Sequence, residues 1–333
     1  MHIVKSAIAA LLGMAVIGPA GFLIFGPAIA EKGMNTVVAH DDYSVSTQAR
    51  TFHQSLTIGD WHADSLLWNR DLLKRADYGH VDFARLAEGN VAIQVFTTVT
   101  QSPAGLNYDE NAATARDQIT LLGVLQIWPV RTWNSRIERA LYQASRMQGY
   151  EQEAPGRVRI LRTKSDLAEV LAARANGKPL TGALLGAEGG HALDKDQANL
   201  GRLYEAGFRL MGLQHFFDNA LGGSLHGQTS EGLTEFGLSV IAEMAERHMI
   251  IDLAHSSPAV VRDVLGALKV PVVLSHTGIH GHCAVKRNIP DELMQQIAAR
   301  GGLIGIGYWA DVTCDASPDG IAKTIRAAID LVG

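Results

Sequence analysis

The chain has 333 residues, of which 47% are hydrophobic and 19% are charged, so it can build a sizeable core and is not an intrinsically disordered protein. Its net charge of −5 and its pI of about 6.2 provide no basic field for nucleic acid, and we exclude that class of partner. The 13 histidines are enough to make a metal site worth searching for.

The N-terminal segment differs in composition from the rest of the chain. Residues 6–30 form an apolar stretch without charges that is long enough to span a bilayer. Ala28-Ile29-Ala30 before Glu31 also fits a small-x-small cleavage site. We therefore expect residues 1–30 to be a transmembrane anchor or a cleaved signal peptide, with the remainder exported to the periplasmic or extracellular face. Residues 31–56 are polar and aperiodic and resemble a linker.

Seven short segments have the length and apolar content of buried parallel strands, and helical material follows each of them. They begin at Thr57, Val91, Thr181, Phe208, Met249, Val270 and Gly302. Such alternation predicts an α/β fold of the (β/α)8 TIM-barrel type over residues 57–333. An eighth strand would begin where the sequence stops, so we expect the last β/α unit to be missing from this chain.

Helical periodicity is visible between and after the strands. Residues 101–178 are mostly helical and form an expected insertion over the mouth of the barrel. Its predicted helices are Asn111–Val124, Trp133–Met147 and Ser165–Arg174, the last with a serine cap. Further helices are expected at Val81–Glu88, Leu238–Glu246, Pro258–Leu268 and Asp319–Val332.

Two predicted strands, Met249–Leu253 and Val270–Leu274, are each followed by a histidine, His255 and His276. The carboxyl ends of parallel strands are where α/β barrels and open sheets hold their reactive groups. Two histidines in equivalent positions are therefore expected to point at one spot. The alternative is a pair of core histidines bonded to main-chain carbonyls.

Other strand ends carry similar chemistry. His62 and Asp64 are two residues apart on an extended chain, so both side chains can reach one ion, and this donor pair suits zinc. Glu188 is followed by two glycines and has no adjacent lysine or arginine, so its burial would be costly unless it bound a cation. A further strand ends at His215.

These four histidines and two carboxylates exceed the needs of one tetrahedral zinc ion. The surplus indicates two metals about 3.5–4 Å apart with a shared ligand. Glu188 lies midway in the order of the ligands, and we choose it as the bridge. This arrangement predicts metal-assisted hydrolysis.

Five segments, HADSLLW, GAEGGHAL, GLQHFFDNA, IDLAHSSP and VLSHTGIHGHCAVKRNIPD, resemble motifs of the membrane (renal-type) dipeptidases, which are amidohydrolase-like metal-dependent TIM barrels. The resemblance covers about residues 57–333. It implies a zinc-dependent dipeptidase in which a metal-bridged hydroxide attacks the peptide bond of a dipeptide. His62 and Asp64 would hold the first Zn2+, Glu188 would bridge, and His255 and His276 would hold the second.

The resemblance assigns three further roles. His215 would stabilise the oxyanion that forms on the substrate carbonyl, and Arg287 would clamp the substrate carboxylate. Cys283 and Cys314 match a disulfide pair of the family, which agrees with export; two free buried thiols are the alternative. The family also favours a homodimer.

The sequence departs from the family pattern in two places. Trp61 and Ala63 replace a glycine and an asparagine of the family motif, without changing a ligand. No residue can be assigned to the family's aspartate of the eighth strand, which receives the substrate amine. Two alternatives therefore stay open, an amidohydrolase acting on a lactam, lactone or cyclic amide and a truncated, non-catalytic remnant. The remaining loop histidines, His191, His226, His280 and His282, are interpreted mainly as ordinary polar residues.

Overall fold

The structure is a computed structural model that describes residues 25–333. The apolar segment of residues 6–30 lies mostly outside this range. Within the described part, no helix is long and apolar enough to cross a bilayer. Residues 25–34 are helical, and Glu31 in this helix is buried, with its carboxylate 3.1 Å from Arg70 Nε.

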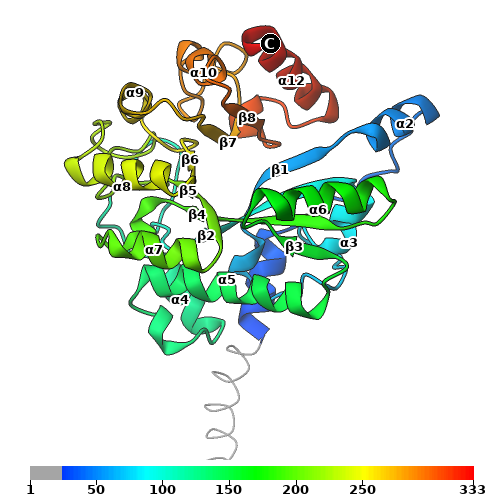
Figure 1. The fold of residues 1–333 in the computed structure, drawn as a ribbon, viewed down its shortest axis with the longest axis horizontal. Helices are drawn as coiled ribbons and strands as arrows, with labels where there is room; N and C mark the ends of the chain where they lie inside the picture. Colours follow the sequence, from blue (N-terminus) through cyan, green and yellow to red (C-terminus); the bar gives the residue numbers. More distant parts are fainter. Residues whose placement is uncertain (1–24) are drawn as a thin grey trace, which may run out of the picture.

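Parallel strands curl into a barrel that is nearly closed (Figure 1). The strands of residues 25–333 are β1 (Ile58–Ala63), β2 (Val91–Val99), β3 (Val158–Ile160), β4 (Thr181–Glu188), β5 (Phe208–Gly212), β6 (Ile250–Asp252), β7 (Val273–Thr277) and β8 (Leu303–Ile306). They pair in the order β1-β2-β4-β5-β6-β7-β8, with β3 pairing β4 beside this path. Strands β1 and β8 are the two ends of the path and face each other across the remaining gap in pairing.

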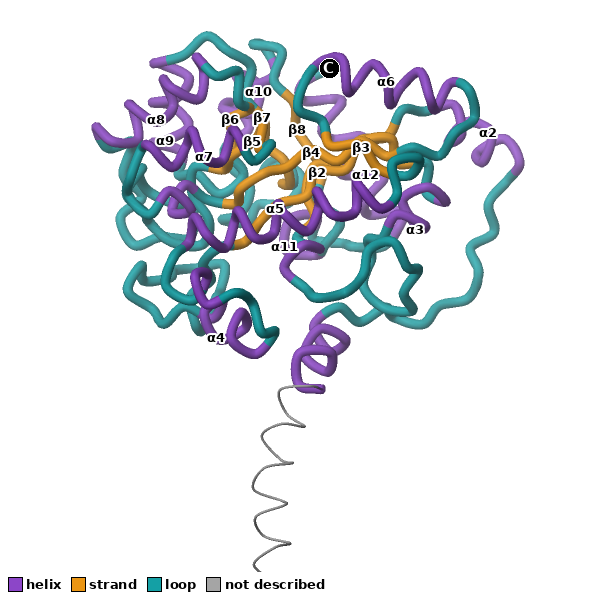
Figure 2. Tube along the Cα trace, turned by 60° about the horizontal axis from the view of Figure 1, so that its bottom comes forward, coloured by secondary structure: helices purple, strands orange, loops and turns teal. Residues whose placement is uncertain are grey.

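Helices surround the strands on the outside of the barrel (Figure 2). They are α2 (Thr47–Ser55), α3 (Phe83–Glu88), α4 (Gln118–Leu125), α5 (Arg136–Glu153), α6 (Lys164–Ala175), α7 (Ala198–Glu205), α8 (Glu235–Glu246), α9 (Pro258–Ala267), α10 (Asp291–Ala298), α11 (Ala310–Thr313) and α12 (Pro318–Val332). All eight residues of β4 are buried, as expected of a strand covered on both faces. The structure thus confirms the predicted parallel barrel.

The seven predicted strands are all present, and six of them begin within one residue of the predicted position. The sixth along the pairing path, β7, begins at Val273 instead of Val270, since Pro271 has no N–H to donate to a ladder. His276 therefore lies inside the strand and not after it. Strand β3 was not predicted, because three residues are too few to show a period of two. It pairs with residues 181–183 of β4, while β5 pairs with residues 185–187.

Two predicted helix starts were wrong for reasons of hydrogen bonding. Helix α4 begins at Gln118, not at Asn111, because the Asp117 side chain accepts from the Ile119 N–H and caps it. Helix α6 is capped by Thr163, not by a serine, in a reciprocal box with Asp166. The segment 31–56, expected to be aperiodic, contains α2, none of whose side chains is buried.

Candidate metal centre

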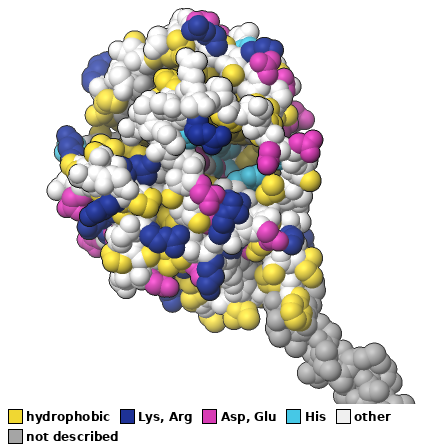
Figure 3. Space-filling model, turned by 90° about the vertical axis from the view of Figure 1, so that its right-hand side faces the viewer, with side chains coloured by type: hydrophobic (Ala, Val, Ile, Leu, Met, Phe, Trp, Pro, Cys, Tyr) yellow, Lys and Arg dark blue, Asp and Glu magenta, His cyan; other side chains and the backbone are white. Residues whose placement is uncertain are grey.

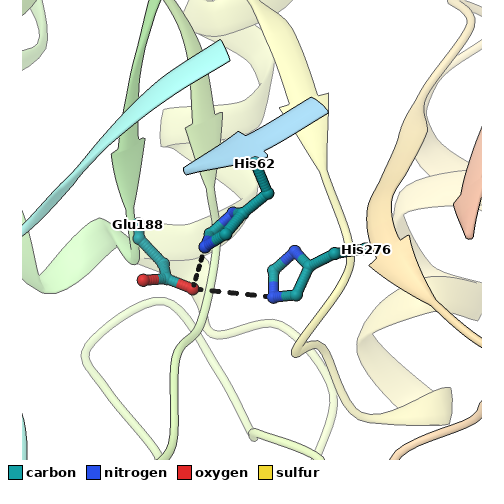
Figure 4. Close-up of side chains that lie close together, drawn as sticks. All are labelled: His62, Glu188 and His276. Atoms are coloured by element: carbon teal, nitrogen blue, oxygen red, sulfur yellow. Dashed lines mark ion pairs between the residues drawn. The ribbon is translucent and has the colours of Figure 1, made fainter. Parts of the chain in front are cut away.

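The six predicted side chains meet at the carboxyl end of the barrel. Figure 4 shows His62 from β1, Glu188 from β4 and His276 from β7 pointing toward one another. Strand β2 connects the other two strands there, since its Val99 pairs with Glu188 of β4 and its Phe96 pairs with Ala63 of β1. The space-filling view shows a hollow with histidine side chains at its bottom (Figure 3). Side chains far apart in sequence therefore share one site.

Glu188 is the centre of a first group of donors. His62 Nε2 lies 3.4 Å from Glu188 Oε1 and also 3.4 Å from Asp64 Oδ2. His276 Nε2 lies 3.7 Å from the same Glu188 oxygen, and the His62 and His276 rings are 3.7 Å apart between centroids. The ligand atoms of His62, Glu188 and His276 are close enough to hold one ion.

Glu188 also belongs to a second group. His215 Nε2 lies 3.4 Å from Glu188 Oε2, and His255 Nε2 lies 3.2 Å from Oε1. These three residues could hold a further ion. The resemblance instead pairs His255 with His276; their Nε2 atoms are 3.1 Å apart, so both pairings are geometrically open. In either case Glu188 is the shared residue, as the sequence predicted.

The donor set fits cations because its lone pairs converge. Ser275 Oγ donates to Asp252 Oδ2 at 2.6 Å, so it accepts from His276 Nδ1 at 2.7 Å. With its proton on Nδ1, a neutral His276 presents a lone pair from Nε2 to Glu188 and to His255. Without an ion these lone pairs would repel one another, whereas a positive ion between them would be coordinated by them. A serine–aspartate relay of this kind orients a metal-binding histidine.

The charges of these side chains also favour a bound cation. Burial first, and then the negative charge of Asp64, raise the pKa of Glu188 to about 8. Burial disfavours the His62 cation, but the carboxylates of Glu188 and Asp64 more than offset this and raise its pKa to about 10. Burial lowers the pKa of His215 to about 4. The carboxyl groups of the buried Glu188 and the partly exposed Asp64 thus attract positive charge into the site.

Residues that the sequence analysis did not select support this centre. Thr97 Oγ1 donates to Asp64 Oδ1 at 2.5 Å. Asp252 also accepts from the main-chain N–H groups of Ala254 and Ser275, so it links the ends of β6 and β7. In the sequence, two features could have indicated these supporting residues. Asp252 is an acid at the end of one apolar strand, and Ser275 directly precedes His276 in the next strand.

Arg287 is buried beside the centre. Its Nη1 donates to the Ala254 carbonyl and its Nη2 donates to the His276 carbonyl at 2.7 Å, so it ties the loop after β6 to β7. Its Nε has no hydrogen-bond partner among residues 25–333. Burial lowers the pKa of Arg287 to about 10, which leaves it a cation at neutral pH.

The loop that carries Arg287 is held by covalent and polar contacts. Cys283 and Cys314 form the disulfide that the resemblance implies. The Asn288 side chain donates to the Cys283 and Val312 carbonyls and accepts from the Gly278 N–H. The segment between β7 and α10 is therefore fixed to the end of α11.

Two histidines interpreted as polar loop residues are in fact buried. His191 is 8% exposed and packs against Phe217, with ring centroids 5.0 Å apart. His226 is fully buried, and burial first, then the Arg287 cation, lower its pKa to about 3. Both lie at the carboxyl end of the barrel, His191 in a short 3-10 helix over Gly190–Leu193 and His226 on a loop, where sequence periodicity gives no information on burial.

A nearly closed parallel barrel with buried histidines and carboxylates at its carboxyl rim defines a metal-binding α/β-barrel protein. Residues 46–333 match the family model described as membrane dipeptidase (peptidase family M19). The chain belongs to this family, as the five sequence motifs indicated.

Solved structures share the fold at low sequence identity. An amidohydrolase from Pseudomonas aeruginosa is 20% identical, with a TM-score of 0.61, over 85% of this chain and 73% of that one. A metallo peptidase from Rhodobacter sphaeroides, liganded with a phosphinate mimic of L-Ala-D-Ala, is 22% identical, with a TM-score of 0.64, over 84% and 83%. The probable dipeptidase PvdM from Pseudomonas aeruginosa is 17% identical, with a TM-score of 0.63, over 79% and 63%. These likenesses support the fold alone.

Proposed function

We propose that the protein is a metal-dependent dipeptidase that hydrolyses the peptide bond of a dipeptide with a free amine and a free carboxylate. The observation that carries this proposal is the position of Glu188, whose two oxygens face different histidines and which belongs to both candidate ion groups. Family membership and the dipeptide mimic bound by the related metallo peptidase support the substrate class.

Different residues of the chain would bind the metal ions and stabilise the developing charge. His62, Asp64, Glu188, His255 and His276 would hold two divalent cations, which we propose are zinc ions because imidazole and carboxylate donors suit zinc. When bound, such a pair activates a water and polarises the amide carbonyl. His215 would donate a hydrogen bond to the oxygen on which negative charge develops.

Arg287 would bind the substrate carboxylate. Its Nη atoms already hold the carbonyls of Ala254 and His276, which fixes the plane of the guanidinium. The buried Nε, which has no partner within the described part of the chain, is left to donate. A charge-assisted bond of this kind would orient a small substrate at one end.

We also propose that the catalytic barrel works outside the cytosol, anchored to or released from a membrane. The disulfide between Cys283 and Cys314 supports this, because such bonds persist in oxidising compartments. The apolar stretch of residues 6–30 supports it as well.

A substrate panel tests the activity. The zinc-loaded protein is incubated with several dipeptides, with their N-acetylated and C-amidated forms, and with lactams and cyclic amides. We expect turnover of free dipeptides and little turnover of the C-amidated forms, because Arg287 would hold the carboxylate of the substrate. The N-acetylated forms test whether the amine must also be free. Cleavage of a cyclic amide without dipeptide turnover would contradict the proposal, and so would a metal-loaded protein that hydrolyses nothing.

A further inference from the structure

His226 lies on the glycine-rich loop between β5 and α8, and its backbone is held at both ends. Its N–H donates to Ser224 Oγ at 3.1 Å, and its carbonyl accepts from the Asn111 N–H at 2.8 Å. Ser224 Oγ in turn donates to the His215 carbonyl. The position of His226 is thus fixed relative to a residue of the metal centre.

The imidazole of His226 is oriented by one hydrogen bond. Its Nδ1 lies 2.8 Å from the Tyr108 carbonyl oxygen. A carbonyl oxygen only accepts, so Nδ1 carries the proton, and in the neutral ring Nε2 keeps a lone pair. Within residues 25–333 that Nε2 is buried and has no hydrogen-bond partner. A buried acceptor left unpaired is destabilising, so it calls for a ligand.

The surroundings of the ring place it in the wall of the metal centre. It stacks on Phe216, with centroids 4.9 Å apart and planes at 25°, and Tyr108 packs edge-on at 5.5 Å. The His255 ring is 5.7 Å away, and Arg287 is near enough for its charge to act on His226. His226 therefore lies in the wall of the site beside His255, within reach of the Arg287 charge.

We propose that His226 Nε2 accepts a hydrogen bond from the side chain of the carboxyl-terminal residue of the dipeptide. The inference rests on the proposed function, in which Arg287 holds the carboxylate of that same residue. Its side chain would then meet an aromatic wall with a single acceptor in it. The enzyme would accordingly prefer carboxyl-terminal residues whose side chain carries a hydroxyl donor, such as serine and threonine, over apolar residues of equal size.

The isosteric substrates Gly-Thr and Gly-Val test this directly, because they differ only in a hydroxyl for a methyl. A site built to bond a substrate hydroxyl rejects the analogue that lacks it, so we expect kcat/KM for Gly-Thr to exceed that for Gly-Val by about 10-fold or more. In the variant His226→Phe, which keeps an aromatic ring without the acceptor, the two values should become equal through loss of Gly-Thr activity. His226→Gln, whose amide oxygen can accept, should recover part of the preference.

The controls separate this inference from the proposed function. Zinc content and denaturation midpoint of each variant are compared with those of the wild type, so that a folding or metal defect is recognised. Equal turnover of Gly-Thr and Gly-Val by the wild type would overturn the inference while leaving the dipeptidase activity in place. A threonine preference that persists in His226→Phe would also overturn it. If neither dipeptide is hydrolysed, the proposed function fails and this inference fails with it.

Discussion

At Glu188 a single buried carboxylate serves two groups of histidines. Its Oε1 lies within 3.7 Å of the Nε2 atoms of His62, His255 and His276, and its Oε2 faces His215. An acid in this position without a paired lysine or arginine would destabilise the fold unless it were protonated or bound to a cation. The local geometry of this one residue therefore gives the strongest physical reason for a metal centre.

His215 is the residue whose role the geometry leaves open, since it is near Glu188 yet is expected to face the substrate. We predict that His215→Ala lowers kcat for a dipeptide by about 100- to 1,000-fold, the loss typical of one donor to an oxyanion. Its zinc content, measured by elemental analysis, should match that of the wild type. His191→Ala, which removes another buried histidine of this rim, is the control and should keep most of the activity. A loss of one zinc per chain in His215→Ala would instead identify His215 as a ligand.

At the scale of elements, the helix starts show how local hydrogen bonds decide boundaries. Sequence periodicity placed α6 correctly but assigned its cap to a serine. In the structure Thr163 Oγ1 accepts from the Asp166 N–H, and the Asp166 side chain accepts from the Thr163 N–H. Both residue types favour caps, and only the backbone conformation of Thr163, with φ at −138°, decides between them.

Measurements of protein stability can test whether Thr163 is the cap of α6. Thr163→Ala should lower the free energy of unfolding by about 0.5–2 kcal/mol, because it leaves an N-terminal N–H of α6 without its cap. Ser165→Ala is the matched control and should change the free energy by no more than about 0.5 kcal/mol, since alanine is favoured inside a helix. The measurement is equilibrium denaturation in urea. A larger loss in Ser165→Ala than in Thr163→Ala would contradict the assignment of the cap.

The strands also differ in how well their own sequences predict them. Long apolar runs such as β2 and β4 were predictable because both faces of each strand are buried. The three residues of β3 were not, because pairing with β4 supplies the order that their own sequence lacks. Strand β7 begins only after Pro271, which has no N–H to donate to a ladder, and His276 therefore lies inside the strand.

At the scale of the whole molecule, the parallel barrel brings distant segments to one rim. The convergence of the six strand-end side chains could be predicted because parallel strands carry their carboxyl ends to the same edge, and apolar strands followed by polar residues are visible in sequence. The residues that orient these side chains could not be predicted. Asp252 and Ser275 orient His276 through contacts across the sheet, and His226 is itself oriented by the Tyr108 carbonyl on another loop; a single sequence does not reveal such contacts.

The disulfide also connects two segments that are distant in the sequence. Cys283 and Cys314 are 31 residues apart, and closing a loop of this size stabilises a fold by about 3–4 kcal/mol in the chain-entropy description. The enclosed segment contains Arg287, β8 and α11. The bond therefore restrains the part of the rim that would hold the substrate carboxylate.

The central claim is that the rim binds two divalent cations that share Glu188. Metal content after dialysis against trace zinc, measured by elemental analysis on folded protein, tests it most directly. We predict two zinc equivalents per chain in the wild type, and loss of both in Glu188→Ala, because that residue belongs to both groups. Glu243→Ala, which removes a carboxylate on α8, should retain both. A wild type without tightly bound metal, or a Glu188→Ala variant that keeps two equivalents, would contradict the account.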